Sequence, residues 1–317
     1  MLNLFLMKNN KFYNHLFFKL SWDDVSKDDV IQIIQLARKE DLEAFGLAKK
    51  PIAFGDFTTN TLVENKEISA KLVARKRLCI CGVELVKLVL DVYDGADGQG
   101  KSSFKSFVKD GDILEAGQEI GIITGFAKTI LQAERILLNF VQHLSGVATL
   151  TNEYVQALSG SNTKLLDTRK TTPTFRVLEK YAISCGGGYN HRMGLFDRIM
   201  LKDNHLSFTN ASKGERLALA VENARKCNPD LAIEVEVDNL EQIPFVLQAN
   251  ADVIMFDNFS LEDLHKAQAL VGDQAWTEIS GNVSIETLPT LGKIACDFVS
   301  TSATITRASW IDIGLDS

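Results

Sequence analysis

Positive charge is concentrated between residues 167 and 205, although the chain as a whole is acidic, with a formal net charge of -7. Apolar runs at 164–167 and 198–201 each read as a buried strand that ends in charged residues. Cations at strand ends beside a flexible glycine turn at 186–188 suit a ligand with several negative charges, and a solvated basic face is the alternative. The cationic and imidazole side chains of the segment are Arg169, Lys170, Arg176, Lys180, His191, Arg192, Arg198, Lys202 and His205.

Carboxylates follow the next strand-like runs. Glu236 and Asp257 would repel each other if both were ionised and unpaired. A Mg²⁺ ion or a developing cation between them would relieve the repulsion, whereas salt bridges to Lys202 and Arg169 are the structural alternative. Glu234 shares the strand face of Glu236, so these residues leave open which glutamate is functional.

Small polar residues and a histidine complete the set of candidate functional residues. The triplet 280–282, Ser-Gly-Asn, precedes a predicted helix, and its backbone N–H groups can bind a phosphate, although such triplets are often turns. His191 beside Arg192 is either an acid/base pair or two anion clamps, and the adjacent arginine favours a neutral imidazole. These groups suit a substrate with carboxylates at one end and phosphates at the other, or an aldolase with a Schiff-base lysine at Lys170 or Lys202.

Length and composition limit the classes of protein that could carry out this chemistry. A chain of 317 residues suits one large or two ordinary domains. The pI near 5.4 argues against general nucleic-acid binding. Five scattered cysteines predict no disulfide framework and a reducing, cytoplasmic setting. Charges interrupt residues 1–24, so we expect an extension that packs on the domain or on a partner subunit, with neither a membrane span nor a signal peptide.

The elements that must position the charged groups alternate between strands and helices after residue 164. The strand-like runs are 164–167, 198–201, 231–237, 252–257, 276–280 and 297–302. The helical stretches are 173–183, 212–227, 239–249, 261–270 and 284–295. This alternation predicts a parallel sheet, and six or more units favour a closed barrel with its chemistry at the C-terminal strand ends.

The first part of the chain has a different pattern. A helix with Ser26 as its N-cap precedes strand-like residues 67–81, and glycines at turn spacing in 104–125 are typical of a β-meander. An apolar stripe over 130–145 predicts a helix that links this α+β region to the barrel. Arg135 lies on this helix, and on spacing alone it is an exposed arginine.

Six motifs occur in order. They are ERILLNFVQHLSGVAT (134–149), DTRKTTPTFRVLEKYA (167–182), CGGGYNHRMGLFDRIMLKDNH (185–205), IEVEVDNLEQ (233–242), IMFDNFS (254–260) and DIGLD (312–316). Together with GDFTT at 55–59, they resemble the nicotinate-nucleotide pyrophosphorylase family, also called quinolinate phosphoribosyltransferases. The resemblance runs from about residue 25 to the C-terminus.

The resemblance implies a fold and an activity. An N-terminal α+β open sandwich with a linking helix would occupy 1–145, a seven-stranded α/β barrel of type II phosphoribosyltransferases 146–306, and a tail returning to the sandwich 307–317. The family converts quinolinate and phosphoribosyl pyrophosphate, with Mg²⁺, to nicotinate mononucleotide, CO₂ and pyrophosphate in NAD synthesis. Its members are homodimers or larger assemblies, and we expect neither nucleic acid nor membrane as a partner.

Carried over motif by motif, the resemblance also implies roles. Arg135 would reach the quinolinate of the neighbouring subunit, and Lys170, Glu236 and Asp257 would be catalytic, the two carboxylates also serving Mg²⁺. The substrate-binding set would be Arg135, Thr168, Arg169, Lys170, His191, Arg192, Lys202, Glu236, Asp257, Ser280, Gly281, Asn282, Ser302 and Ala303.

Three positions depart from the family pattern near the expected phosphate site. Asn282 and Ser302 stand where the family usually has glycine, and Thr306 stands where it usually has histidine. Asparagine can adopt glycine-like backbone angles, and a serine hydroxyl can replace close backbone approach. A non-catalytic member of the fold, whose phosphate loop has drifted, is therefore a further alternative.

Overall fold

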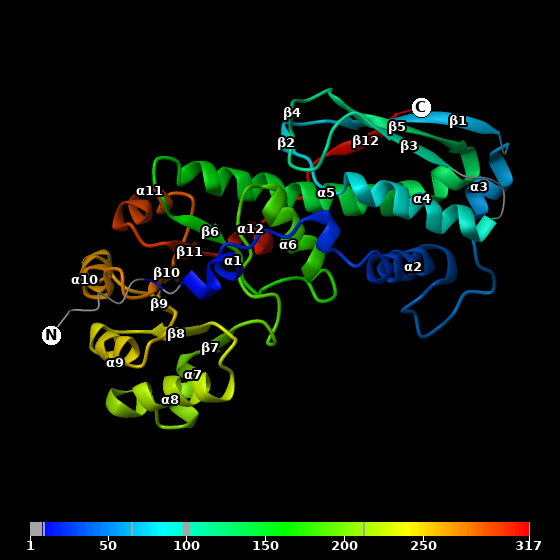
Figure 1. Ribbon diagram of the computed structural model, residues 1–317. Helices are drawn as coiled ribbons and strands as arrows, with labels where there is room; N and C mark the ends of the chain where they lie inside the picture. Colours follow the sequence, from blue (N-terminus) through cyan, green and yellow to red (C-terminus); the bar gives the residue numbers. More distant parts are fainter. Residues whose placement is uncertain (1–7, 9, 65, 98–101, 212, 317) are drawn as a thin grey trace. The chain divides into compact units, whose positions relative to one another are not determined.

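The computed structural model describes residues 1–317 except 1–7, 9, 65, 98–101, 212 and 317 (Figure 1). The chain forms two compact units. The barrel unit comprises 1–19, 153–171 and 188–306, and the sandwich unit comprises 20–152, 172–187 and 307–317. Helix α5 (Ala127–Ala157) runs from one unit into the other.

A parallel sheet with the strand order β6-β11-β10-β9-β8-β7 forms the centre of the barrel unit. Every strand lies within a run predicted from the sequence, because continuous apolar segments buried on both faces identify such strands well. The strands are β6 (Lys164–Leu166), β7 (Ile199–Leu201), β8 (Ile233–Val237), β9 (Val253–Asp257), β10 (Trp276–Ser280) and β11 (Phe298–Ser300).

Next to β6, where a seventh strand would pair, the described residues form only a single bridge. Tyr189 forms an isolated parallel bridge with Leu166 of β6. Its N–H donates to the Leu165 carbonyl at 2.8 Å, and its carbonyl accepts from the Asp167 N–H at 3.1 Å. The α/β class is thus confirmed, but the sheet has six strands and one bridge instead of the seven strands expected. Among the described residues, its end strands β6 and β7 are not paired with each other.

Short helices follow the strands of the barrel unit. They are α7 (Asp203–Phe208), α8 (Gly214–Cys227), α9 (Ile243–Gln248) after the 3-10 turn η3 (Leu240–Gln242), α10 (Leu261–Val271), α11 (Leu288–Leu291) with η4 (Gly292–Ile294), and α12 (Ala303–Thr306). The predicted helix at 284–295 is reduced to α11 and η4. Pro289 lies in the first turn of α11, and Gly292 ends it.

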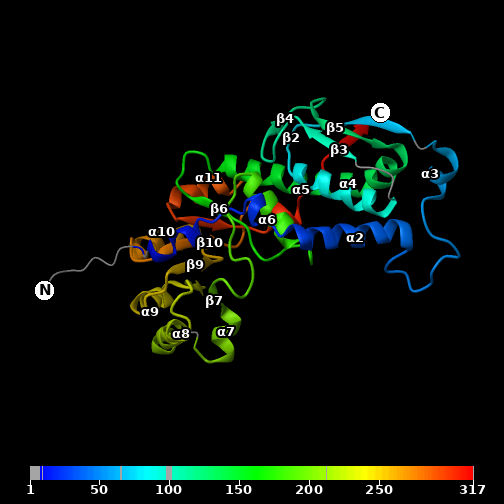
Figure 2. The same ribbon diagram turned by 45° about the vertical axis from the view of Figure 1, so that its right-hand side comes forward.

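The start of the chain packs on the barrel unit. After η1 (Asn10–Phe12) comes α1 (Tyr13–Leu16), which lies beside the sheet in Figure 2. Phe12 and Leu16 are buried in one cluster with Val253, Trp276 and Phe298. These three residues begin β9, β10 and β11, so this segment covers the sheet edge opposite the carboxyl ends. The sequence had grouped residues 1–24 with the N-terminal domain, whereas 1–19 belong to the barrel unit.

The sandwich unit contains an antiparallel sheet with the order β12-β1-β5-β3, as the α+β pattern predicted. Its strands are β1 (Glu67–Ala74), β3 (Ser103–Ser106), β5 (Glu119–Phe126) and β12 (Ile313–Asp316), beside a small pair β2 (Leu78–Cys79) and β4 (Ile113–Leu114). Its helices are η2 (Trp22–Asp24), α2 (Lys27–Glu43), α3 (Phe57–Leu62), α4 (Val83–Asp97) and α6 (Arg176–Cys185). The Ser26 side chain accepts the Asp29 N–H as the expected N-cap of α2.

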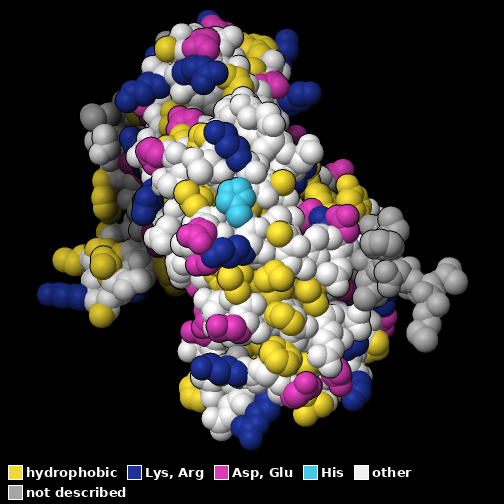
Figure 3. All heavy atoms as spheres, turned by 90° about the vertical axis from the view of Figure 1, so that its left-hand side faces the viewer, with side chains coloured by type: hydrophobic (Ala, Val, Ile, Leu, Met, Phe, Trp, Pro, Cys, Tyr) yellow, Lys and Arg dark blue, Asp and Glu magenta, His cyan; other side chains and the backbone are white. Residues whose placement is uncertain are grey.

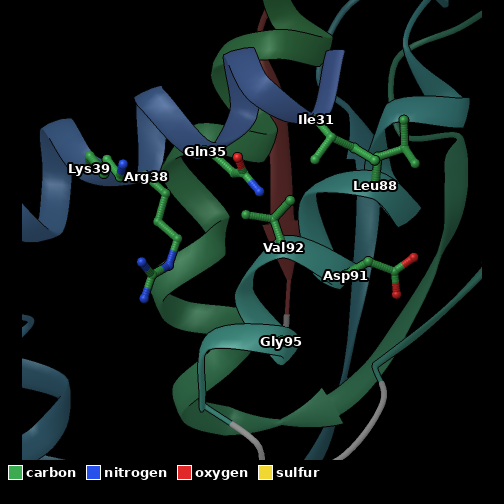
Figure 4. Close-up of a pocket in the computed structure, with 8 residues that line it drawn as sticks. All are labelled: Ile31, Gln35, Arg38, Lys39, Leu88, Asp91, Val92 and Gly95. Atoms are coloured by element: carbon green, nitrogen blue, oxygen red, sulfur yellow. The ribbon is translucent and has the colours of Figure 1, made fainter. Parts of the chain in front are cut away.

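A cavity of about 630 Å³ lies between α2 and α4 of the sandwich unit (Figure 4). Its lining residues are Ile31, Gln35, Arg38, Lys39, Leu88, Asp91, Val92 and Gly95. None of the site residues predicted from the sequence is among them.

On the face drawn in Figure 3, Lys and Arg side chains are interspersed with Asp and Glu. Within the described residues, every helix is too short or too polar to span a bilayer.

Candidate active site

The carboxyl ends of the barrel strands meet at one edge of the sheet, called here the rim. Parallel pairing aligns Ser280 with Asp257, and Ser300 with Leu166. The residues that end or follow the strands therefore gather there, as the barrel prediction required. The predicted residues that the rim brings together are Thr168, Arg169, Lys170, Lys202, Glu236, Asp257, Ser280, Gly281, Asn282, Ser302 and Ala303.

The guanidinium groups of Arg169 and Arg192 interact electrostatically in the barrel unit. Arg169 is half-buried, and its Nε is buried without a hydrogen-bond partner among the described residues. Arg192 is buried, and its Nη1 donates to the Arg198 carbonyl at 3.4 Å. Burial and then the charge of Arg169 lower the pKa of Arg192. Two partly desolvated like charges and an unsatisfied donor make this a site for an anion.

The lysines of the rim differ in their surroundings. Lys202 Nζ donates to Glu236 Oε2 at 2.6 Å, which is the salt bridge of the structural alternative. The Lys170 side chain is exposed, and its backbone N–H donates to Thr168 Oγ1 at 3.1 Å. One lysine is thus held against a carboxylate, and the other projects its charge to solvent.

Glu234 and Glu236 have different environments although they share a face of β8. Glu236 lies nearer the rim, and 12% of its side chain is accessible, whereas the Glu234 side chain is wholly buried. Arg198 Nη1 lies 3.1 Å from Glu234 Oε2, and His191 Nε2 lies 3.1 Å from the same oxygen. The sequence left open which of the two glutamates is functional. In the structure, Glu236 lies at the rim and Glu234 lies in the interior.

His191, Arg198, Glu234 and Glu278 form what we call the barrel charge cluster, and all four are buried. His191 Nε2 also lies 3.5 Å from Glu278 Oε2. Burial alone would raise the pKa of Glu234, but His191 and Arg198 lower it to about 2. Burial and the charge of Glu234 raise the pKa of Glu278 above its ordinary value.

The cluster also corrects the expectation for His191. The sequence predicted a neutral imidazole because of the adjacent Arg192. Burial does lower the pKa of His191, but the carboxylates of Glu234 and Glu278 outweigh it, and the net pKa is raised. The direction of this shift is opposite to the one expected from the chain neighbour Arg192, because Nε2 faces carboxylates from the strands β8 and β10.

Asp167 positions the loop that carries His191 and Arg192. Its Oδ1 accepts the His191 N–H at 2.8 Å, and its Oδ2 accepts Asn190 Nδ2 at 2.7 Å. Neither Asp167 nor Asn190 was assigned a role from the sequence. The available signal was a carboxylate placed directly after the apolar run at 164–166, where burial without a partner would be costly.

Residues with a left-handed backbone conformation follow β9 and β10 at the rim. Asn258, Gly281 and Asn282 have φ values of 57°, 87° and 53°. A Cβ on Gly281 would lie 2.1 Å from Asn258 Oδ1, so only glycine fits there. Asn282 adopts the glycine-like conformation that its replacement of glycine requires, and its Nδ2 donates to Asn258 Oδ1 at 3.4 Å. Asn258 Nδ2 in turn donates to Asp257 Oδ2 at 2.8 Å.

Ser302 and Ala303 lie after β11. The Ser302 carbonyl accepts the N–H groups of Ile305 and Thr306 at 3.0 and 2.9 Å, and the Ala303 N–H donates to Thr301 Oγ1 at 3.1 Å. Thr306, the third departure from the family pattern, is exposed.

Arg135 is the one predicted site residue that lies in the sandwich unit. It is exposed on α5. Its predicted role is to contact the quinolinate bound by a neighbouring subunit, which requires a second chain.

Glu236 and Asp257 offer oxygen ligands, which Mg²⁺ prefers. They belong to neither of the two groups of three potential metal ligands that the described residues contain. Mg²⁺ commonly binds through one or two carboxylates together with substrate phosphates and water. The two residues fit that mode, in which the ion is completed by the substrate, and not an all-protein cage.

Comparisons with known proteins agree with this architecture. Residues 56–145 match the family model "Quinolinate phosphoribosyl transferase, N-terminal domain", and residues 147–316 match the corresponding C-terminal domain. A relative from Bacillus subtilis, named "Probable nicotinate-nucleotide pyrophosphorylase (carboxylating)", is 36% identical over 267 residues, covering 84% of this chain and 89% of its own. The Mycobacterium leprae nicotinate-nucleotide pyrophosphorylase (carboxylating) is 35% identical over 297 residues, covering 92% and 99%.

A solved structure extends the likeness to three dimensions. The nicotinate-nucleotide pyrophosphorylase from Francisella tularensis superposes with a TM-score of 0.83 at 34% identity, and the match covers 94% of this chain and 99% of that one. Two domain matches in order, relatives above 30% identity over most of the chain, and the same fold lead to one conclusion: the chain belongs to the quinolinate phosphoribosyl transferase family.

Proposed function

We propose that this protein is a quinolinate phosphoribosyltransferase, which converts quinolinate and phosphoribosyl pyrophosphate to nicotinate mononucleotide, CO₂ and pyrophosphate. The observation that carries the proposal is the pair Arg169 and Arg192. The charge of Arg169 lowers the pKa of Arg192, and Arg169 Nε is buried without a hydrogen-bond partner among the described residues. The two carboxylates of a pyridine diacid would satisfy this donor and neutralise both charges. We also infer a cytoplasmic location, in keeping with five unpaired cysteines.

The barrel charge cluster lies beneath this anion site and orders it. Asp167 fixes the backbone of His191, and Glu234 fixes its ring from the other side. Held in this way, His191 and Arg192 lose little conformational freedom when the diacid binds. The clamp therefore acts chiefly by positioning the pyridine ring for attack.

Glu236 and Asp257 supply the negative charge of the rim. Departure of pyrophosphate leaves positive charge on the ribose, which two carboxylates at adjacent strand ends stabilise electrostatically. Mg²⁺ held by Glu236, Asp257 and substrate oxygens would neutralise charge on the pyrophosphate group. Lys202 is paired with Glu236 at 2.6 Å in the free protein, so substrate anions would draw its ammonium away and leave Glu236 facing the ribose.

The remaining rim residues suit the phosphate end of the substrate. Gly281 and Asn282 have positive φ values and expose backbone N–H groups in a turn, and Ser280 and Ser302 add hydroxyls. After the pyridine nitrogen attacks the ribose carbon, the ring becomes cationic and accepts the electrons of the bond to the adjacent carboxylate. That carboxylate then leaves as CO₂, and the ring carbon that carried it takes up a proton from solvent, which gives nicotinate mononucleotide.

The direct test is incubation of the protein with quinolinate, phosphoribosyl pyrophosphate and Mg²⁺, with detection of nicotinate mononucleotide. Arg169→Ala should lower kcat/KM for quinolinate by about 30- to 5,000-fold, because losing one partner of a desolvated charge contact costs about 2–5 kcal/mol. The exposed Arg216 of the same unit provides a matched control, and Arg216→Ala should leave kcat/KM unchanged.

Two results would contradict the proposal. Absence of product at high protein concentration would favour the non-catalytic alternative. Trapping of a sugar phosphate by borohydride at Lys170 or Lys202 would favour the Schiff-base aldolase.

We further propose that the protein is a homodimer, or a larger assembly, in which Arg135 serves the neighbouring subunit's site. Arg135 is exposed and lies in the unit that lacks the rim. Mixing Arg135→Ala protein with Lys170→Ala protein should restore part of the activity through hybrid dimers that contain one intact site. If subunit exchange is demonstrated and activity stays at the level of the separate variants, the site is not shared.

A further inference from the structure

The sandwich unit contains a second group of buried polar side chains, remote in sequence from one another. Cys81 lies between β2 and α4, Asp110 lies in the turn between β3 and β4, and Cys185 is the last residue of α6. One ligand atom from each of these residues lies within 4.8 Å of the others. The Tyr181 hydroxyl donates to Asp110 Oδ2 at 2.9 Å. We call Cys81, Asp110 and Cys185, with Tyr181, the thiol cluster.

The cluster has a partly buried carboxylate, Asp110, without a cation beside it. Asp110 Oδ1 accepts the Val83 N–H at 2.9 Å, and Tyr181 serves Oδ2. No lysine, arginine or histidine forms an ion pair with Asp110 among the described residues. Burial raises the pKa of Asp110 to about 6, because three neutral donors, the N–H groups of Val83 and Gly82 and the Tyr181 hydroxyl, do not replace the water it loses. A positive ion at this place would supply the missing compensation.

The ligand types indicate which ion. Thiolates favour Zn²⁺, Cu(I) and iron–sulfur clusters, and a carboxylate beside two thiolates favours Zn²⁺ among them. Zn–S bonds of about 2.3 Å and Zn–O bonds of about 2.0–2.2 Å place tetrahedral ligand atoms roughly 3–4 Å apart. The cluster atoms, all within 4.8 Å, would need to contract by at most about 1–2 Å around the ion.

We propose that Cys81, Asp110 and Cys185 form a Zn²⁺ site, with water as the fourth ligand. Two thiol protons are released to solvent when the ion binds, and the metal keeps its oxidation state. Tyr181 orients the Asp110 carboxylate through its hydroxyl, the usual role of a group behind a metal ligand. Asp110 and Cys185 are only partly buried, which leaves a path for the ion and the water. The site would join the turn at 107–112, the start of α4 and the end of α6.

Cys79 is nearby but is directed elsewhere. Its Sγ donates to the carbonyls of Gly111 and Cys185, each at 3.6 Å. Cys79 and Cys81 form a C-x-C pair, and the surrounding sequence lacks the second cysteine or histidine pair that zinc-binding motifs usually have. The third cysteine, 104 positions away from Cys81, reaches the cluster only through the fold.

The first experiment uses the full-length wild-type protein and needs no substitution. The protein is stripped with chelator under reducing conditions and titrated with Zn²⁺, and bound metal is measured after removal of the excess. We expect one Zn²⁺ per chain. Titration with Co²⁺ should produce the intense sulfur-to-metal charge-transfer bands and the visible d–d bands of a tetrahedral thiolate site. Absence of these bands in the folded, reduced protein would overturn the proposal.

The second experiment compares variants with matched controls. Cys81→Ser and Cys185→Ser should lose Zn²⁺ affinity by more than about 100-fold, and Tyr181→Phe should lose roughly 10–100-fold, as for a group behind a ligand. Cys79→Ser and Cys296→Ser replace buried thiols outside the ligand set and should bind as wild type does.

Two outcomes would refute the assignment. One is equal Zn²⁺ binding by wild type and Cys185→Ser. The other is loss of two thiols from the wild type in air, with a Cys81–Cys185 disulfide found by peptide mapping and no Zn²⁺ bound by the reduced chain. These readouts do not depend on transferase activity, so they stand or fall apart from the proposed function.

Discussion

Loss of water acts on a carboxylate in the barrel charge cluster and on one in the thiol cluster, with opposite results. Burial would raise the pKa of Glu234, but the charges of His191 and Arg198 lower it to about 2. The pKa of Asp110 is raised to about 6, because its partners are peptide N–H groups and a phenol hydroxyl, all of them neutral. The difference teaches that a formal cation within about 3 Å, and not the degree of burial, decides whether a buried acid keeps its charge.

The same difference separates the roles we assign to the clusters. In the barrel, the compensated charges hold His191 and thereby the neighbouring Arg192 beneath the rim. In the sandwich unit, the uncompensated carboxylate beside two thiols is a site to which a metal ion can add the missing charge. Changes that add or remove a charge in either cluster therefore test the comparison directly.

The largest effect is expected from Arg198→Met, which removes the cation that compensates Glu234. Breaking a buried ion pair by removing one partner costs about 3–5 kcal/mol of unfolding free energy, because the remaining charge is left uncompensated. Denaturant unfolding of the purified protein measures the loss. Arg216→Met, a change at an exposed arginine of the same unit, should stay within about 0.5 kcal/mol. Equal losses in the two variants would show that charge compensation is not the cause.

An intermediate, pH-dependent effect is expected from Glu278→Gln. The pKa of Glu278 is raised in the folded protein by burial and by Glu234, so its contribution to stability is complete below the unfolded pKa of 4.5 and is lost as pH rises toward the folded pKa. The glutamine variant carries no such proton. Its stability relative to wild type should rise by about 1.4 kcal/mol for each pH unit above 4.5, until the folded pKa is reached. Parallel curves of unfolding free energy against pH for the two proteins would contradict a raised pKa of Glu278 in the folded protein.

The smallest effect is expected from Asp110→Asn in metal-free protein. No cation is left unpaired when this charge is removed, and the amide can exchange one neutral hydrogen bond for another, so unfolding free energy should change by about 1 kcal/mol or less. Unfolding in the presence of chelator measures it. A loss as large as that of Arg198→Met would mean that Asp110 is compensated by a group the comparison overlooks.

The strands of the barrel unit could be predicted from the sequence because each is a short apolar run between polar residues. The C-terminal part of α5 could not. The stripe at 130–145 predicted an end near Gly146, but the helix continues to Ala157. Gly146 allows close approach, since a Cβ there would lie 2.2 Å from the Ser309 carbonyl oxygen. Val147 and Thr151 are buried, so tertiary packing overrides their weak helix propensity.

The residues of the candidate active site also divide into those that could be placed from the sequence and those that could not. Arg169, Lys170, Lys202, Glu236 and Asp257 could be placed at one rim because each ends or follows a predicted strand. The roles of Asp167, Arg198 and Glu278 were not visible, because their partners come from other strands.

The sequence by itself determined the order of the elements, the residue types at the ends of the parallel strands and, through six motifs in order, the family. Only the tertiary structure decided which charges are compensated. It paired Arg198 with Glu234, placed Glu236 rather than Glu234 at the rim, and brought Cys185 to Cys81 and Asp110. The physical reason is that strand and helix patterns depend on neighbours within a few residues, whereas burial and charge pairing depend on groups that meet only when distant segments fold together.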